Sequence, residues 1–149
     1  MRLVITAMLC VAALALSACG HEDAASYLID GPRYSLSLLR EKPYLWSSGW
    51  DLALVTTHMP DCLRRNKLDH AEDADFKIDL YRTFNAGYIL RHENNWYVTE
   101  TQKCQLQQFK SPPPAPGNLL GSFEEKDGRL QFVSAADETA TSARPRSAR

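Results

Sequence analysis

Hydrophobic and polar residues alternate along much of the chain between residues 27 and 133, a pattern typical of β-strands with one buried face. The clearest example is the segment 75–80, where Phe76, Ile78 and Leu80 alternate with charged residues. Similar alternation occurs at residues 34–38, 50–57, 88–90, 96–99 and 104–109. The pattern therefore predicts a domain in which strands are the main elements.

Turn signals separate neighbouring alternating segments. Asp127-Gly128 lies between residues 121–126 and 129–133, and this dipeptide between alternating segments is the strongest short-range signal for a β-hairpin. A two-residue turn there places Phe123 opposite Phe132. Residues 93–95, Glu-Asn-Asn, predict a second hairpin, because Asn tolerates the left-handed conformation of tight turns. Both hairpins favour antiparallel sheets.

Short strands joined by turns predict an all-β, antiparallel domain at residues 27–133. About eight strands can form either a small barrel or a sandwich, and the pattern leaves both open. No run of ten or more residues has a clear helical period, and residues 60–68 are the best helix candidate. Residues 69–75 are expected to form an acidic loop, and the proline-rich residues 111–117 an extended segment outside the sheets. Residues 134–149 lack aromatic side chains and are expected to be disordered.

The amino-terminal segment has the parts of a secretory signal. Arg2 supplies a positive charge, Leu3 to Leu16 form an apolar run interrupted only by Thr6, and small residues follow it. The run is short for a membrane span, which needs about 20 apolar residues. These features predict that the chain is exported.

The residues Leu16-Ser17-Ala18-Cys19 resemble the lipobox of bacterial lipoproteins. The resemblance implies cleavage before Cys19, diacylation of its sulfur and acylation of the new amino terminus, and the following Gly20 implies forwarding to the outer membrane. Several acyl chains form a lasting anchor, since each buried methylene contributes about 0.8 kcal/mol. Residues 1–18 are then the signal peptide and residues 19–26 a lipidated tether. An ordinary secretory signal ending at 13–15, Ala-Leu-Ala, is the alternative.

The chain has four cysteines, Cys10, Cys19, Cys62 and Cys104. On the lipoprotein interpretation Cys10 leaves with the signal peptide and the lipid occupies Cys19. The remaining two cysteines are free to pair in an oxidising periplasm, which predicts a Cys62–Cys104 disulfide. Such a bridge closes a loop of 43 residues, and chain entropy gives that loop about 4 kcal/mol of stabilisation. A reactive pair of His58 with Cys62, or metal ligation, is the alternative.

The composition favours neither catalysis nor nucleic-acid binding. After removal of the signal peptide, 16 basic residues face 18 acidic ones, so there is no basic excess. The sequence has no nucleophile elbow and no closed zinc-ligand spacing, although His58 and His70 accompany the two later cysteines. We therefore predict no enzyme, no cofactor and no metal site. The basic residues 64–67 are interpreted as a solvated strand face, with an anion-docking or partner-docking patch as the alternative.

Aromatic residues gather in the segment 44–50, where Tyr44, Trp46 and Trp50 surround Ser-Ser-Gly. A loop with exposed Trp and Tyr is typical of interaction sites, so these three residues are candidate docking residues. The resulting hypothesis is a non-catalytic protein-interaction module that is anchored in the outer membrane, faces the periplasm and binds an unknown envelope protein. The alternative is a carrier whose aromatic residues line a barrel mouth and hold a small ligand or lipid.

Overall fold

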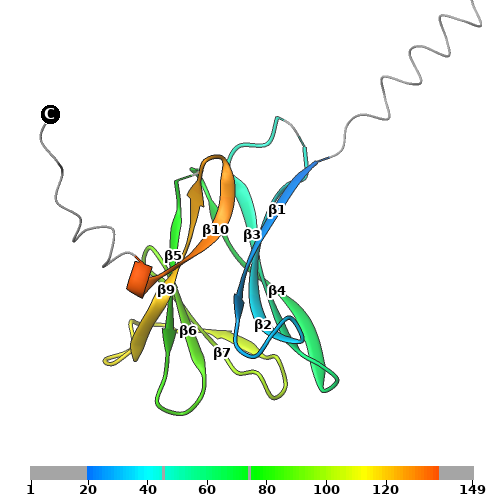
Figure 1. Ribbon diagram of the computed structural model, residues 1–149. Helices are drawn as coiled ribbons and strands as arrows, with labels where there is room; N and C mark the ends of the chain where they lie inside the picture. The colour runs from blue at the N-terminus through cyan, green and yellow to red at the C-terminus, as the bar shows by residue number, and fades with distance from the viewer. Residues whose placement is uncertain (1–19, 45, 74, 138–149) are drawn as a thin grey trace, which may run out of the picture.

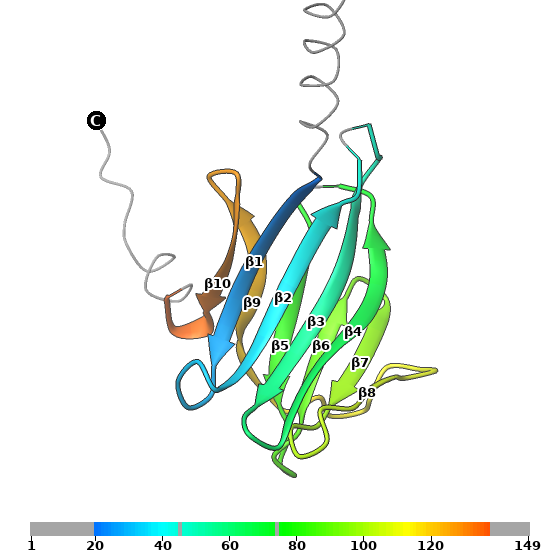
Figure 2. The same cartoon turned by 90° about the vertical axis from the view of Figure 1, so that its right-hand side faces the viewer.

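The computed structural model describes residues 20–44, 46–73 and 75–137 (Figure 1). Within these ranges the chain forms ten β-strands in two antiparallel sheets that face each other (Figure 2). The first sheet contains β1 (His21–Leu28), β2 (Tyr34–Lys42), β3 (Trp50–His58) and β4 (Cys62–Ala71) in that order. The second sheet, in the order β10-β9-β5-β6-β7-β8, contains β5 (Lys77–Arg82), β6 (Tyr88–His92), β7 (Asn95–Thr99), β8 (Leu106–Gln108), β9 (Asn118–Lys126) and β10 (Arg129–Ser134).

The all-β prediction is confirmed, and of the two architectures the structure has the sandwich. The described strands pair into two separate ladders, of four and six strands, rather than one closed sheet. Strands β1 and β10 lie side by side at one edge of the sandwich (Figure 1). At the other edge β4 is joined to the segment before β8 by a disulfide.

The core lies between the sheets and is formed by alternate residues of the central strands. Leu36, Leu38, Leu54, Ile78, Leu80, Leu90 and Phe123 have no exposed surface. These positions follow the period of two in the sequence, because successive side chains of a strand point to opposite faces. Burying a side chain of this size contributes about 1.5–3 kcal/mol, so this filled core is the main source of the fold's stability.

The β9–β10 hairpin follows the sequence prediction residue by residue. Lys126 pairs with Arg129 across the turn, and Phe123 pairs with Phe132. Asp127 and Gly128 have φ values of 54° and 78°, the two left-handed residues that a tight hairpin turn with the correct twist requires. The two phenylalanine rings meet edge to face with centroids 5.0 Å apart.

Several boundaries differ from the sequence predictions. Residues 21–26, expected to be a tether, belong to β1. This polar segment is an edge strand that covers the core with only one face, where Ala25 is buried while Ala24 and Ser26 are exposed. Ser134, the first residue of the predicted disordered tail, ends β10, and residues 138–149 lie outside the described residues.

The helix candidate at residues 60–68 is also wrong, because β4 begins at Cys62 and extends to Ala71. Pairing with β3 supplies the backbone hydrogen bonds of this edge strand. The polar sequence of the segment does not by itself predict that pairing. The acidic loop is correspondingly shorter than predicted, since residues 69–71 belong to β4. In the β6–β7 turn the left-handed residue is Glu93, with a φ of 53°, and Asn95 already begins β7. The proline-rich residues 111–117 form no strand, as predicted.

The strands of both sheets lie along roughly the same axis, so the sandwich has two distinct ends (Figure 2). The Gly20 end contains the start of β1, the loop of residues 43–49 and the β9–β10 turn; Arg40 near this end of β2 bonds to Gly128 O in that turn. The Phe84 end contains the β1–β2 turn, the β3–β4 turn and the β5–β6 loop of residues 83–87. Tyr34 at the start of β2 contacts Thr101 beyond β7, which fixes this end in both sheets.

Candidate functional surface

The loop of residues 43–49 presents two aromatic side chains to solvent at the Gly20 end. Trp46 is 77% exposed and Tyr44 is 56% exposed. Their rings stack with centroids 5.1 Å apart and planes 9° from parallel. Stacking covers one face of each ring, so the remaining apolar surface and the polar tips of both side chains stay available to a partner.

The base of this loop is held tightly against the first sheet. Gly49 has a φ of 64°, and a Cβ atom at this position would lie 2.3 Å from Ala71 O and 2.3 Å from His70 Nε2. Any larger residue would therefore push the loop away from β4. The Ser47 N–H donates to Tyr44 O over 3.1 Å. The aromatic pair thus projects from a loop whose base is fixed against β4.

Trp50, the third predicted docking residue, is not presented with the other two. It is only 8% exposed and is the first residue of β3, on the inner face. Arg40 Cζ lies 4.4 Å and Lys42 Nζ 4.7 Å from the centre of its ring. Its role is therefore to pack beneath two cationic side chains, and its assignment as an exposed docking residue is wrong.

Arg40 is buried and links three segments at the Gly20 end. It forms ion pairs with Asp23 of β1, over 3.0 Å, and with Glu125 of β9, and it donates to Gly128 O over 3.2 Å. Asp23 also accepts from the Leu130 N–H over 2.6 Å. Burial raises the pKa of Asp23, but the hydrogen bond from Leu130 and the charge of Arg40 outweigh it and hold the pKa below its ordinary value of 3.8. This network ties β1 and β2 to the β9–β10 hairpin.

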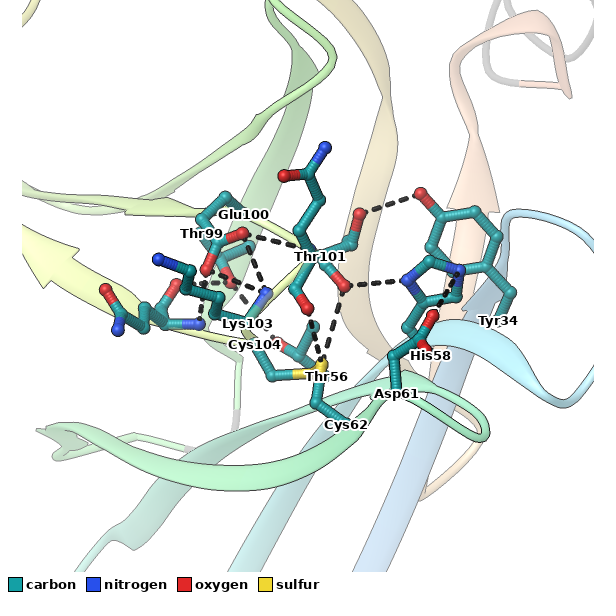
Figure 3. Close-up of a disulfide and its surroundings, with 12 residues drawn as sticks. Tyr34, Thr56, His58, Asp61, Cys62, Thr99, Glu100, Thr101, Lys103 and Cys104 are labelled. Carbon is teal, nitrogen blue, oxygen red and sulfur yellow. Dashed lines mark hydrogen bonds and ion pairs between the residues drawn. A yellow bond between two sulfur atoms is a disulfide. The ribbon is translucent and has the colours of Figure 1, made fainter.

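The predicted disulfide forms between Cys62 and Cys104, with Cα atoms 6.0 Å apart (Figure 3). His58, which the alternative interpretation pairs with a free Cys62 thiol, instead uses Nδ1 to donate to Thr101 O over 2.9 Å. Its ring stacks on Tyr34 at 4.3 Å, and Tyr34 OH lies 2.7 Å from Thr101 Oγ1. The Cys62 sulfur is bonded in the disulfide and therefore supplies no thiolate. The role of this cluster is to join the two sheets at the Phe84 end.

The segment that carries Cys104 is organised by Glu100. Its carboxylate accepts hydrogen bonds from the backbone N–H groups of Gln102, Lys103 and Gln105. Burial raises the pKa of Glu100, but these three donors prevail and hold it below its ordinary value of 4.5. The loop from Glu100 to Gln105 is therefore shaped by one anion.

Sequence reasoning missed a second polar link between the sheets, at Asp69 of β4. Its carboxylate accepts from His92 Nδ1 over 2.8 Å, from Asn95 Nδ2 over 2.7 Å and from Tyr97 OH over 3.0 Å. Burial, and next the negative charge of Asp69, raise the pKa of Tyr97 from 10.0 to about 12. Asp69 lies within an acidic run of the sequence, so only the fold distinguishes it from its solvated neighbours.

This Asp69–His92 pair resembles half of a catalytic arrangement, but its surroundings are structural. His92 is 2% exposed, and its Nε2 atom is enclosed without a hydrogen-bond partner in the part of the chain that the structure describes. A general base must reach the proton that it removes, directly or through one water. We assign no reaction to the pair, because the Nε2 atom of His92 has almost no solvent-exposed surface.

The described surface contains three clefts that could hold a small ligand. The first, of about 330 Å³, lies beside the start of β5 and is lined by Asp75, Phe76, Lys77, Asp79, Arg91, His92 and Glu93. The second, of about 280 Å³, adjoins the aromatic loop and is lined by Pro43, Ser47, Ser48, Gly49, Asp51 and His70. The third, of about 210 Å³, is lined by Val98, Glu100, Gln105 and Gln107. All three are open to solvent; the first two have mainly polar walls and the third a mainly apolar one, and none of them is the enclosed apolar cavity that the carrier hypothesis requires.

The possible metal ligands do not converge. His58 lies at the Phe84 end, whereas His70 lies near the Gly20 end and bonds to Asp51 over 2.9 Å. Residues 20–44, 46–73 and 75–137 contain no group of three or more His, Cys, Asp or Glu side chains that could hold a metal ion.

In the basic run of residues 64–67, Arg65 pairs with Glu41 over 2.8 Å on the outer face of the first sheet.

The predicted lipidation site Cys19 and the signal peptide lie outside the described residues. Within the described ranges, no helix is both long and apolar enough to cross a bilayer. Comparison of the chain with protein-family models, curated proteins and solved structures found no match. The functional interpretation therefore rests on this chain's own residues.

Proposed function

We propose that this chain is a lipid-anchored, non-catalytic protein-interaction module of the bacterial cell envelope. The anchor is an acylated Cys19 in the outer membrane, as the lipobox resemblance implies, and the sandwich faces the periplasm. The Cys62–Cys104 disulfide supports an oxidising compartment, because such bridges persist mainly outside the cytosol. The filled core and the open clefts favour binding at the surface over storage of a ligand inside.

The start of β1 determines how the anchored domain is oriented. Because β1 begins at His21, only Gly20 separates the ordered domain from Cys19. One residue spans at most about 3.6 Å, so the Gly20 end must lie against the membrane. The Phe84 end is then the one that projects into the periplasm, where a soluble or membrane-bound partner can reach it.

The observation that carries the proposal is the gathering of exposed apolar side chains at the Phe84 end. Phe84 is 86% exposed in the β5–β6 loop, and Leu63 is 65% exposed at the start of β4. Leu28, Met59 and Leu119, at this same end, are 54%, 46% and 42% exposed. Single exposed apolar residues are common on protein surfaces, but five large ones at one end supply apolar surface of the kind at which proteins associate.

The Phe84 loop is prepared for binding by its own hydrogen bonds. Thr83 N donates to Gly87 O over 3.0 Å, and the Gly87 N–H donates back to Thr83 Oγ1 over 3.0 Å. A loop fixed in this way loses little conformational entropy when its side chain enters a pocket on the partner. Phe84 is therefore the residue that we expect to contribute most to partner affinity.

Site-specific photo-crosslinking in intact cells tests the proposal. A photoreactive amino acid replaces Phe84 in the lipidated chain, and the same amino acid replaces the exposed Gln131 of β10 as the matched control. We expect a discrete protein adduct from position 84 and none from position 131. Absence of an adduct at position 84, or the same adducts at both positions, would contradict docking at the Phe84 end.

A further inference from the structure

The chain leaves the sandwich directly beside the exposed aromatic pair. His21 pairs with Lys42 in the sheet, and the rings of His21 and Trp50 meet edge to face with centroids 5.5 Å apart. A Cβ atom at Gly20 would lie 2.4 Å from Lys42 O and 3.2 Å from Pro43 O. Figures 1 and 2 both show the start of β1 next to the loop between β2 and β3. Gly20 therefore touches the base of the loop that presents Tyr44 and Trp46.

This contact has a consequence for a chain that is acylated at Cys19, and to that extent it rests on the proposed function. Cys19 is covalently bonded to Gly20, so its acyl chains enter the bilayer within a few ångströms of Pro43. The loop of residues 43–49 then faces the lipid headgroups. A folded protein partner could not fit between this loop and the membrane, whereas lipid is already present there.

Tyr and Trp are the side chains that prefer this environment. Their rings favour the boundary between headgroups and acyl chains, where the apolar body is buried and the O–H or N–H group remains hydrated. Trp46 and Tyr44 expose most of their surface in the isolated domain, and no neighbouring segment covers them among the described residues. Contact with lipid would remove this apolar surface from water.

Three charged side chains next to the loop have partners within the domain. Lys42 lies over Trp50, Glu41 pairs with Arg65 over 2.8 Å, and Asp51 pairs with His70 over 2.9 Å. These neighbours leave little charge for attraction to anionic lipid. Membrane contact by the loop is therefore expected to depend on its aromatic side chains and only weakly on the lipid's charge.

We infer that Tyr44 and Trp46 insert into the interfacial layer of the membrane that holds the Cys19 anchor. They form a second attachment point that stops the sandwich from tilting or rotating about its lipid. The ligand is the headgroup–acyl boundary of the bilayer itself. This attachment keeps the Phe84 end directed away from the membrane.

Quenching of tryptophan fluorescence by brominated lipids tests the insertion. The lipidated chain carries Trp50→Phe and Trp96→Phe, so that Trp46 is its one tryptophan, and is reconstituted in phosphatidylcholine vesicles with brominated acyl chains. We expect an approximately two-fold loss of Trp46 emission, since an interfacial side chain lies about 5–10 Å into the headgroup–acyl boundary. The matched control adds Trp46→Phe and Phe84→Trp, and its single tryptophan at the opposite end should keep its emission.

The outcomes separate the insertion from the anchor. If the chain does not float with vesicles, the anchor itself fails. If it floats but Trp46 is unquenched and as open to acrylamide as in a soluble Cys19→Ser chain, the insertion is overturned and the anchor stands. Photo-crosslinking of position 46 to a protein would overturn it as well. Should Trp50→Phe prevent folding, the quenching difference between the unaltered chain and Trp46→Phe decides the same question.

Discussion

Asp69 on β4 and His92 on β6 are hydrogen-bonded across the two sheets, with 2.8 Å between Oδ2 and Nδ1. The same carboxylate accepts from Asn95 and Tyr97 of β7, so one anion of the first sheet satisfies three donors of the second. His92 and Tyr97 are buried, so these two donors depend on Asp69 as their acceptor. Asp69 therefore holds the two sheets together at the edge opposite to β1 and β10.

Replacement of this carboxylate should destabilise the fold. We expect Asp69→Ala to lower the free energy of unfolding by about 1–3 kcal/mol or more, because buried donors lose a charged acceptor. Urea denaturation followed by circular dichroism measures the change. The control is Asp73→Ala in the adjacent exposed loop, for which about 0.5 kcal/mol or less is expected. Equal denaturation midpoints for the two variants would contradict the role of Asp69 in holding the sheets together.

Alkaline pH should weaken the same cluster. The pKa of Tyr97 is raised from 10.0 to about 12 in the folded chain, so the unfolded chain loses this proton first. The stabilisation is complete below pH 10 and is lost as the pH rises through 12. Titration of tyrosinate absorbance should show a late-ionising tyrosine that is missing in Tyr97→Phe, while the late ionisation of Tyr88, whose pKa is also raised by burial, remains. If Tyr97→Phe instead removes a tyrosine that ionises at its ordinary pKa, the burial of Tyr97 beside Asp69 would be contradicted.

Acid should act through Asp23 at the opposite edge. The pKa of Asp23 is lowered in the folded chain, so the carboxylate form stabilises the fold above its ordinary value of 3.8 and this contribution disappears as the pH falls through the depressed value. Asp23→Asn should therefore reduce stability at neutral pH and flatten its dependence on pH under acidic conditions. Asp127→Asn in the β9–β10 turn is the control, since Asn also suits that turn. Parallel acid profiles for Asp23→Asn and the unaltered chain would contradict this assignment.

The disulfide should account for a large share of the stability. Replacing Cys62 and Cys104 together by alanine should lower the free energy of unfolding by about 4 kcal/mol in the chain-entropy description. Denaturation of the oxidised chain, the reduced chain and the double variant measures this, and the last two should agree closely. Alkylation of the unreduced, denatured protein should label neither cysteine, and labelling of Cys62 would contradict the bridge.

Local chemistry explains what the sequence could predict. The Asp127-Gly128 hairpin is determined by two residues that accept positive φ, and the buried strands by alternating side chains of the same segment. Alternation also grouped Trp50 with Leu52 and Leu54 on one face. This alternation correctly places Trp50 on the inner face of β3. The hypothesis that a serine-glycine loop exposes Trp50 to a partner was wrong, because β3 begins at this residue.

Long-range pairing explains what the sequence could not show. β1 and β4 are polar edge strands, and each is held as a strand by its pairing with β2 or β3. The selection of Asp69 from an acidic run depends on β6 and β7, more than twenty residues further along. The start of β1 at His21 has the largest functional consequence, because residues 21–26 form a strand in place of the predicted tether and the proposed anchor at Cys19 would therefore lie next to the sandwich.

The intact mass of the mature protein, extracted from bacterial membranes in detergent, tests the central claim most directly. We expect a chain that begins at Cys19, carries a diacylated sulfur and an acylated amino terminus, and lacks two hydrogens because Cys62 and Cys104 are joined. A chain that begins before Cys19, or one in which Cys19 has a free thiol, would contradict the anchor and the orientation derived from it.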